Sequence, residues 1–299
     1  MQRVVMTGAT GLIGSRLSPL LEEGGYDVVH LTRDRKRSDS AKSFVWDPPK
    51  SYADSDAFRT GDIIIHLAGA NIAAGRWSKK RKEEIISSRV NSAALLFSRT
   101  VNAGIIPSAF ITASASGYYG AVTAQKIFTE TDPPAADFLG ETCRKWEEAA
   151  QPFAENGVRI VKIRTSVVFA ATGSAFSKMT MPASAGLIVR PGPGSQYFPW
   201  IHIDDLCAVY LMAVREAGMS GPYNAVAPDY VTLDGLYKEI ARQKHLPVFL
   251  PHIPVWLMRA VLGEMSVMLT TGSRVSSERL TNAGFDFRYP DLASALRAC

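Results

Sequence analysis

The sequence predicts an α/β fold, with a doubly wound parallel sheet, helices on both of its faces and a small C-terminal α/β lobe. Three observations support this prediction. Short apolar runs alternate with helical patterns through the first half of the chain, which indicates βαβ units. The first apolar run leads through closely spaced glycines into a helix. After about residue 165 the alternation gives way to segments rich in glycine, proline and aromatic residues, as expected for a separate lobe.

The elements of the first half follow in order from periodicity and from end signals. The first helix stops at Gly24 and Gly25, a common C-terminal signal. The run DIIIHL at residues 62–67 is apolar enough for a buried parallel strand. The predicted strands are 4–6, 28–32, 43–46, 62–67, 109–113 and 159–163, and the predicted helices are 13–23, 78–103 and 138–156.

The second half is less regular. Residues 173–200 carry glycine, proline and aromatic residues, as a loop over a site would. A helix is predicted to follow, with Asp204 as its N-cap and Asp205 in its first turn. Further helices are predicted at 233–243, 254–262 and 291–298. We therefore expect residues 1–165 to form the sheet domain, with 195–225 returning to it. Residues 166–194 and 226–299 would form the smaller substrate lobe.

The glycines at positions 8, 11 and 14 lie in TGATGLIG, between a strand and a helix. This context is typical of the Rossmann dinucleotide fold. Gly8 permits a tight turn, Gly11 lets a pyrophosphate approach the backbone, and Gly14 lets the helix and strand pack closely. The helix N-terminus then offers N–H groups and a favourable dipole to the phosphates.

The end of the second strand selects between NAD and NADP. An NAD protein usually carries Asp or Glu there, to bind the ribose hydroxyls. Here the position falls on Thr32, and Arg33 and Arg35 follow. A neutral residue followed by arginine suits a 2′-phosphate, which favours NADP(H). If the strand ran two residues longer, Asp34 would take the position and NAD would be favoured.

With these residues in view, the chain resembles the extended branch of the short-chain dehydrogenase/reductase superfamily, and within it the group named "epimerase family". The resemblance spans nearly the whole chain, and the last fifty or so residues resemble that group's C-terminal extension. The shared segments are TGATGLIG (7–14), HLAGANI (66–72), RWSKKRKEEIISSRV (76–90), SASGYYG (114–120), ETCRKWEEAA (141–150) and GSQYFPWIHIDDL (194–206).

The resemblance implies further cofactor contacts: Thr32 and Arg33 at the adenosine phosphate, Leu67 and Ala68 at the adenine and ribose, Glu84 and Arg89 on the long helix, and Val168 at the nicotinamide end. Without the resemblance, Glu84 and Arg89 would be interpreted as a surface pair on a charged helix. The complete set of expected contacts is Gly8, Thr10, Gly11, Leu12, Ile13, Gly14, Thr32, Arg33, Arg35, Leu67, Ala68, Gly69, Glu84, Arg89 and Val168.

The residues expected for catalysis match the pattern of the resembled family less well than those of the cofactor motif do. Members that transfer hydride use a Ser or Thr and a Tyr-x-x-x-Lys pair, in which the lysine lowers the tyrosine's pKa. Residues 137–143, where the pair should fall, read DFLGETC and contain neither. The substitutes at the end of the fifth strand are Ser114, Tyr118 and Tyr119, and the cations that could assist a tyrosine are Lys126, Lys145 and Arg164. The motif Tyr-Tyr-Gly also occurs as a purely structural feature.

The histidines, tryptophans and cysteines offer few further candidates for catalysis or metal binding. His202 lies among apolar residues, which favours a packed histidine over a catalytic one. Trp77 and Trp200 are equally consistent with a substrate pocket and with the core. The five histidines are scattered and the three cysteines lack a C-x-x-C spacing, so neither a metal site nor a disulfide framework is expected.

The net charge of +5 is concentrated at residues 33–37 and 76–89, where it is better explained by cofactor phosphates or solvation than by nucleic acid. We find no signal-peptide pattern and no membrane-length apolar run, and we expect a reducing, cytoplasmic compartment. A homodimer is compatible with the resemblance, since extended members often pair through two long helices. Two functions remain open: an NADP-dependent oxidoreductase or epimerase on an unknown small substrate, and a non-catalytic NADP(H) sensor or regulatory protein.

Overall fold

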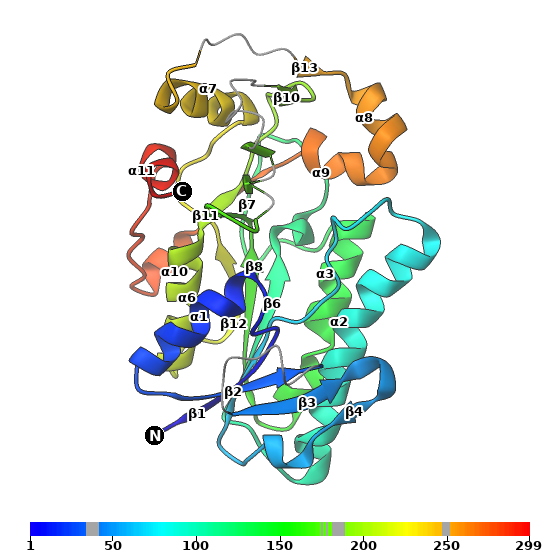
Figure 1. Ribbon diagram of the computed structural model, residues 1–299, viewed down its shortest axis with the longest axis vertical. Helices are drawn as coiled ribbons and strands as arrows, with labels where there is room; N and C mark the ends of the chain where they lie inside the picture. Colours follow the sequence, from blue (N-terminus) through cyan, green and yellow to red (C-terminus); the bar gives the residue numbers. More distant parts are fainter. Residues whose placement is uncertain (34–41, 175, 178, 181–188, 247–251) are drawn as a thin grey trace.

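A computed structural model describes residues 1–33, 42–174, 176–177, 179–180, 189–246 and 252–299 (Figure 1). Its central sheet contains β1 (Arg3–Thr7), β2 (Asp27–Thr32), β3 (Ser43–Asp47), β4 (Tyr52–Ala53), β5 (Ile63–His66), β6 (Ala109–Ala115), β8 (Arg159–Thr165) and β12 (Gly221–Ala225). The strand order is β12-β8-β6-β5-β1-β2-β3-β4, and all neighbours are parallel except β3 and β4. The predicted parallel α/β sheet is confirmed.

Both faces of this sheet are covered by helices. These are α1 (Leu12–Glu23), α2 (Lys79–Arg99), α3 (Phe138–Glu148), α4 (Gln151–Glu155) and α6 (Ile203–Arg215). Helices α1 and α6 lie on one side, and α2 and α3 on the other (Figure 1). Side chains alternate accordingly along β1, where Val4 and Met6 join the core under α1 and α6, and Val5 joins the core under α2 and α4.

The strand order reverses between β1 and β5, because the chain builds β2 and β3 on one side of β1 and then crosses to the other. In open α/β sheets, ligands bind outside the carboxyl ends of the strands at such a reversal. The glycine turn follows β1 at this edge, so the topology places the predicted cofactor motif at the expected position.

The C-terminal lobe contains a set of helices and the short strands β9 (Val167–Phe169), β10 (Arg190–Pro191), β13 (His252–Ile253) and β14 (Arg274–Val275). They pair in parallel as β7–β14, β9–β11 and β10–β13, in which β7 (Ile127–Phe128) and β11 (Trp200–His202) come from outside the residue ranges of the lobe. Its helices are α7 (Leu233–Gln243), α8 (Val255–Leu262), α9 (Val267–Thr270), α10 (Glu278–Asn282) and α11 (Leu292–Ala298).

Two interactions of buried residues attach this lobe to the sheet domain. The carboxylate of Asp205, in the first turn of α6, accepts backbone N–H bonds from Arg288 (2.8 Å) and Tyr289 (3.0 Å). The amide of Asn224, on β12, donates to the carbonyl of Ser276 (3.0 Å). The C-terminal segment is therefore bonded to the domain that carries the cofactor motif.

Some predicted boundaries were wrong. His202, and not Asp204, is the N-cap of α6, because its Nδ1 accepts the N–H of Asp204 (3.2 Å). The helix predicted at 138–156 is two helices, since Pro152 has no N–H to continue the ladder from α3. The helix predicted at 78–103 is α-helical only to Arg99, after which Thr100 leaves helical geometry and a 3₁₀ turn follows. Among the described helices, none has both the length and the apolar character of a membrane span.

Candidate functional site

The glycine turn after β1 has the geometry that a diphosphate requires. Gly8 adopts a φ of +70°, which side-chain-bearing residues rarely adopt. A Cβ on Gly14 would lie 2.6 Å from the Cα of Ala9 and closer still to the carbonyl oxygen of Gly8. Helix α1 starts after Gly11 without a side-chain cap, so its first N–H groups remain available for an anion. The residues present therefore fit a dinucleotide pyrophosphate.

A buried chain of hydrogen bonds connects this turn to the end of β5. The Thr7 hydroxyl accepts the N–H groups of Leu67 (3.1 Å) and Ala68 (3.2 Å), and lies 2.8 Å from Nδ1 of His66. The hydroxyl proton is therefore donated to Nδ1. The other ring nitrogen, Nε2, carries the imidazole proton and donates it to the hydroxyl of Ser92 (2.9 Å). This network orients residues 67 and 68 toward the glycine turn.

His66 is neutral in this network. Its side chain is fully buried, and burial lowers its pKa to about 4. The backbone that follows it lies close to the glycine turn, since a Cβ on Gly8 would lie 3.1 Å from the nitrogen of Ala68. Thr7 and His66 were not singled out from the sequence. The available signal was a histidine inside the apolar run DIIIHL, which a buried strand tolerates only with hydrogen-bond partners.

The predicted 2′-phosphate contacts lie at the end of β2. Thr32 is the last residue of that strand and is half-buried, and Arg33 follows it with an exposed side chain. Among the described residues, none forms an ion pair with Arg33. Asp34 and Arg35 lie outside the described residues. The alternative in which Asp34 ends the strand is therefore not tested by the structure. The described strand ends at Thr32.

The remaining expected contacts in and near the glycine turn differ in exposure. Thr10 is exposed, and Leu12 and Ile13 are half-buried at the start of α1. Val168 lies on β9, half-buried, and packs against the same core as Leu12. The structure thus brings the turn and β9 to one apolar cluster.

Glu84 and Arg89 lie on different faces of α2. The carboxylate of Glu84 is exposed and pairs with Arg81 (2.7 Å). Arg89 is buried, and its guanidinium donates to the carbonyl of Ile85 (2.8 Å). The two side chains are therefore not a surface pair. Glu84 keeps the character of a surface residue, whereas Arg89 faces the protein interior.

Ser114, at the end of β6, belongs to a buried ion-pair network. Its hydroxyl donates to Glu147 (2.8 Å), and Glu147 accepts two hydrogen bonds from Arg164 (2.8 and 3.0 Å). Burial alone would lower the pKa of Arg164, but the Glu147 carboxylate outweighs burial and raises it. The guanidinium of Arg164 is thus permanently charged, and the Ser114 hydroxyl is engaged with the Glu147 carboxylate.

Tyr119 extends this network. Its hydroxyl accepts a hydrogen bond from Arg164 (3.0 Å) and donates to the side-chain oxygen of Asn224 (2.6 Å). The side chain is 2% exposed, and burial raises its pKa to about 12. These contacts favour a structural role for Tyr119, and the same reasoning applies to Ser114.

Tyr118 differs from its neighbour. It is half-buried, and its ring lies 3.5 Å from the guanidinium carbon of Arg164. Burial raises its pKa, and Arg164 opposes this increase only in part. Of the cations considered from the sequence, the structure brings Arg164 to the tyrosines, whereas Lys126 pairs with Asp132 and Lys145 with Glu141 on exposed surface.

The face of α3 beside Gly117 carries no tyrosine and lysine four residues apart. A Cβ on Gly117 would lie 3.5 Å from Cβ of Leu139 and 3.8 Å from the sulfur of Cys143. These two residues are four apart, so they occupy one helix face. Burial raises the pKa of the Cys143 thiol to about 12, which keeps it neutral.

His202 and the two tryptophans are packed. His202 is buried, caps α6 and lies against the ring of Tyr289, with centroids 4.0 Å apart. Trp200 is fully buried in the core of the C-terminal lobe. Trp77 is buried, donates to the carbonyl of Ile72 (3.0 Å) and contacts Phe138 edge-on. Within the described segments, no three His, Cys, Asp or Glu side chains converge as metal ligands.

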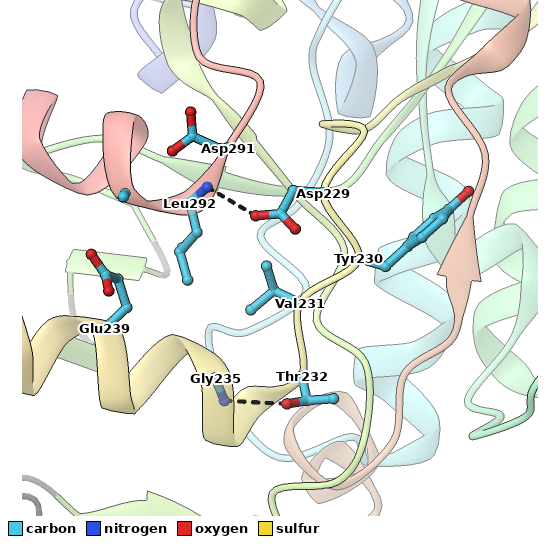
Figure 2. A pocket seen from close by; sticks show the side chains of 9 residues that line it. Asp229, Tyr230, Val231, Thr232, Gly235, Glu239, Asp291 and Leu292 are labelled. Carbon is cyan, nitrogen blue, oxygen red and sulfur yellow. Dashed lines mark hydrogen bonds between the residues drawn. The ribbon is translucent and has the colours of Figure 1, made fainter.

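A separate cavity of about 450 Å³ lies between α7 and the start of α11 (Figure 2). Two of its polar groups are already engaged: Asp229 accepts the N–H of Leu292 (3.0 Å), and Thr232 accepts the N–H of Gly235 (3.2 Å). No residue of the glycine turn lines it. We therefore place the candidate site at the carboxyl edge of the sheet, where the chemistry-bearing residues converge.

Known proteins resemble this chain over nearly its whole length. Residues 4–225 match the family described as "NAD dependent epimerase/dehydratase family", and residues 253–299 match a domain of unknown function. "Epimerase family protein YfhF" of Bacillus subtilis is 35% identical over 298 residues, which cover 98% of this chain and 96% of that protein.

Solved structures are similar over the same length. The crystal structure of human epimerase family protein SDR39U1 (isoform 2) with NADPH has a TM-score of 0.89 and 28% identity, covering 99% of this chain and 98% of that one. UDP-glucose 4-epimerase from Thermotoga maritima, with UDP-glucose, has a TM-score of 0.79 and 16% identity, covering 99% and 98%. At that identity the second likeness concerns the fold alone.

Proposed function

Because the chain belongs to the NAD-dependent epimerase/dehydratase family, we propose that it is an NADP(H)-dependent oxidoreductase or epimerase that acts on a small carbonyl or hydroxyl substrate. The observation that carries the proposal is the glycine turn at the β1–β5 reversal. The turn has glycine where a side chain would clash with the backbone, and the N–H groups at the start of α1 have no side-chain cap. Both features suit the binding of a diphosphate. A relative of similar length, human SDR39U1, was crystallised with NADPH, which supports the same class of cofactor.

The preference for NADP(H) over NAD(H) rests on the end of β2. Thr32 is neutral, so it would not repel a 2′-phosphate. Arg33 is exposed and without an ion pair among the described residues, so its guanidinium is available to bind phosphate oxygens in a forked geometry. An acidic residue at position 32 would favour the ribose hydroxyls of NAD instead.

For the chemical step we propose Tyr118 as the proton donor. Its hydroxyl is protonated at neutral pH and can donate to an oxygen that gains negative charge during carbonyl reduction. Burial raises its pKa, and the nearby Arg164 guanidinium acts in the opposite direction, as a cation beside a catalytic tyrosine should. Arg164 lies over its ring and is held in place by Glu147. A bound nicotinamide would supply hydride to the carbonyl carbon, and Tyr118 would donate its proton to the carbonyl oxygen. Tyr119 is too deeply buried to contact a substrate.

The test is an assay of NADPH oxidation on a panel of carbonyl compounds and nucleotide sugars. We expect Tyr118→Phe to lower kcat by about 10²- to 10⁴-fold while NADPH affinity stays unchanged. Tyr26→Phe is the matched control, because Tyr26 is half-buried against the core on the α1 and α6 side of the sheet. Undiminished turnover by Tyr118→Phe would remove the tyrosine from the mechanism.

One observation favours a second candidate, a protein that binds NADP(H) without turnover. The α3 face beside Gly117 carries Leu139 and the neutral Cys143, where hydride-transferring relatives need a tyrosine and a lysine. Tight NADPH binding without turnover across the whole panel would support this sensor function. It would leave the cofactor part of the proposal intact.

A further inference from the structure

The apolar side chains of α8 face solvent rather than the protein core. Met258 is the buried residue of this helix, whereas Trp256 and Val261 are 70% and 63% exposed. Leu257 and Ala260 are exposed as well. These four exposed residues share one side of the helix because they are adjacent or about one turn apart, and we call them the apolar face of α8. In α7, by contrast, the apolar side chains are buried.

Trp256 differs from the other tryptophans of the chain. Trp46, Trp77, Trp146 and Trp200 are each at most 8% exposed. A tryptophan in water exposes a large apolar ring, so a surface that carries one is commonly a contact surface. Tryptophan is also enriched at membrane–water interfaces, where its ring meets an apolar phase and its N–H meets a polar one.

Four cations lie around this apolar face. Arg259 is exposed on α8 itself. The guanidinium of Arg76 is exposed and donates to the carbonyl of Ala260 (3.1 Å). Lys79 and Lys80 are exposed in the first turn of α2. None of these four side chains forms an ion pair with a carboxylate in the part of the chain that the structure describes.

An ion pair holds the start of α2 against the end of α8. Nζ of Lys82 lies 2.6 Å from a carboxylate oxygen of Glu264, two residues beyond the helix. The two segments that meet here, residues 76–84 and 252–270, together carry six Lys or Arg and three Glu. The surroundings of the apolar face are therefore net positive.

We propose that the apolar face of α8 docks on an anionic membrane surface, with the surrounding cations against the lipid headgroups. Apolar residues with a tryptophan, flanked by Lys and Arg, are the arrangement of helices that lie in the membrane interface. Figure 1 shows α8 at the outer edge of the C-terminal lobe, on the opposite side from α11. A second copy of the chain would fit less well, because a two-fold dimer through this face would bring the same positive surroundings together.

The first experiment measures co-sedimentation of the wild-type protein with lipid vesicles. Phosphatidylcholine vesicles that contain phosphatidylserine are compared with vesicles of phosphatidylcholine alone. We expect at least about tenfold stronger partitioning onto the anionic vesicles. Most of this difference should be lost at about 1 M salt, because charges are then screened beyond about 3 Å.

Two variants remove apolar surface from the face. We expect Trp256→Ser to weaken partitioning onto anionic vesicles by at least about tenfold, and Val261→Ser by about three- to tenfold. Tyr52→Ser is the matched control, because Tyr52 is 47% exposed on β4, at the other end of the molecule (Figure 1). All three side chains are exposed, so each variant should keep the wild-type melting temperature and thereby be shown to be folded.

The fluorescence of Trp256 reports the contact directly. Because the other tryptophans are buried, acrylamide dissolved in the water quenches mainly this residue. We expect anionic vesicles to shift the emission to shorter wavelength and to reduce acrylamide quenching by at least about twofold. Vesicles of phosphatidylcholine alone should have little effect on either quantity.

Three results would overturn the proposal: equal partitioning onto the two kinds of vesicle, quenching that anionic vesicles leave unchanged, or wild-type partitioning by Trp256→Ser. Self-association that Trp256→Ser abolishes, in a protein that binds no vesicles, would overturn it in favour of a second copy. The proposal does not depend on the cofactor. A protein that binds anionic vesicles but no NADPH would refute the proposed function alone.

Discussion

The Thr7 hydroxyl and Nδ1 of His66 lie 2.8 Å apart, in a hydrogen bond that joins the end of β1 to the end of β5. The strand order reverses between these two strands, so the contact stabilises the edge at which a dinucleotide would lie. Because Thr7 also accepts the N–H groups of residues 67 and 68, a single threonine connects the glycine turn with the opposite wall of the site.

The neutral state of His66 predicts a pH dependence of stability. In the folded protein its pKa is about 4, whereas an unfolded histidine titrates near 6.5. As the pH falls below 6.5, His66 is protonated in the unfolded state but stays neutral in the folded state. The free energy of unfolding therefore decreases between pH 6.5 and 4. We expect His66 to account for a loss of about 3 kcal/mol across this window, measured by urea unfolding.

The matched variant is His66→Gln, which cannot titrate. It should be less stable than the wild type near pH 7, because it disturbs the bonds to Thr7 and Ser92, but its stability should fall less steeply toward pH 4. His202, whose pKa is also lowered by burial, contributes equally to both proteins. Identical pH slopes would show that His66 is not buried in its neutral form.

Gly14→Ala should disrupt the cofactor site. The added methyl group would overlap the backbone of Gly8 and Ala9, neither of which is a flexible side chain. We expect the turn to shift and the NADPH affinity to fall by at least about tenfold, measured by fluorescence titration. Gly218→Ala is the control, since a Cβ there meets nothing within 4 Å. Full NADPH affinity in Gly14→Ala would contradict the assigned geometry of the turn.

Removal of Arg164 should destabilise the whole protein. Arg164→Met would leave the Glu147 carboxylate buried without its cation, a change that typically costs about 3–5 kcal/mol of folding free energy. Arg144→Met is the control, because Arg144 pairs with Glu148 on exposed surface and should contribute less than about 1 kcal/mol. Similar losses of stability in the two variants, measured by chemical denaturation, would argue against a dehydrated ion pair at Arg164.

Arg33→Ala should change the cofactor preference. Loss of a charge-assisted phosphate contact costs about 1.5–3 kcal/mol, so NADPH affinity should fall while NADH affinity stays nearly constant. Lys238→Ala, on the exposed surface of α7, removes one positive charge away from the site and controls for net charge. If Arg33→Ala weakened both cofactors equally, the guanidinium would not be the phosphate ligand.

Much of the fold and of the cofactor motif could be predicted from local patterns. The glycine turn, the six principal strands and the helix at 233–243 follow from periodicity and from residues with special backbone requirements, which are properties of short segments. Pro152 is the local signal for the break between α3 and α4, because a proline has no N–H to donate within a helix. The two-residue strands of the C-terminal lobe carry too little pattern to be predicted.

The catalytic candidates were less predictable because their roles depend on long-range contacts. Ser114 and Glu147 lie 33 residues apart, and Tyr119 and Asn224 lie 105 apart. Nothing in the local sequence indicates that Tyr119 is buried whereas Tyr118 is only half-buried. Likewise, Glu84 and Arg89 looked like one charged surface, and only the orientation of α2 shows that Arg89 is buried.

The central claim is tested most directly by titrating the purified wild-type protein with NADPH and NADH and following nicotinamide fluorescence. The account predicts saturable NADPH binding that is at least about tenfold tighter than NADH binding. Absence of binding by either nucleotide at about millimolar concentration, where weak complexes still form, would contradict it.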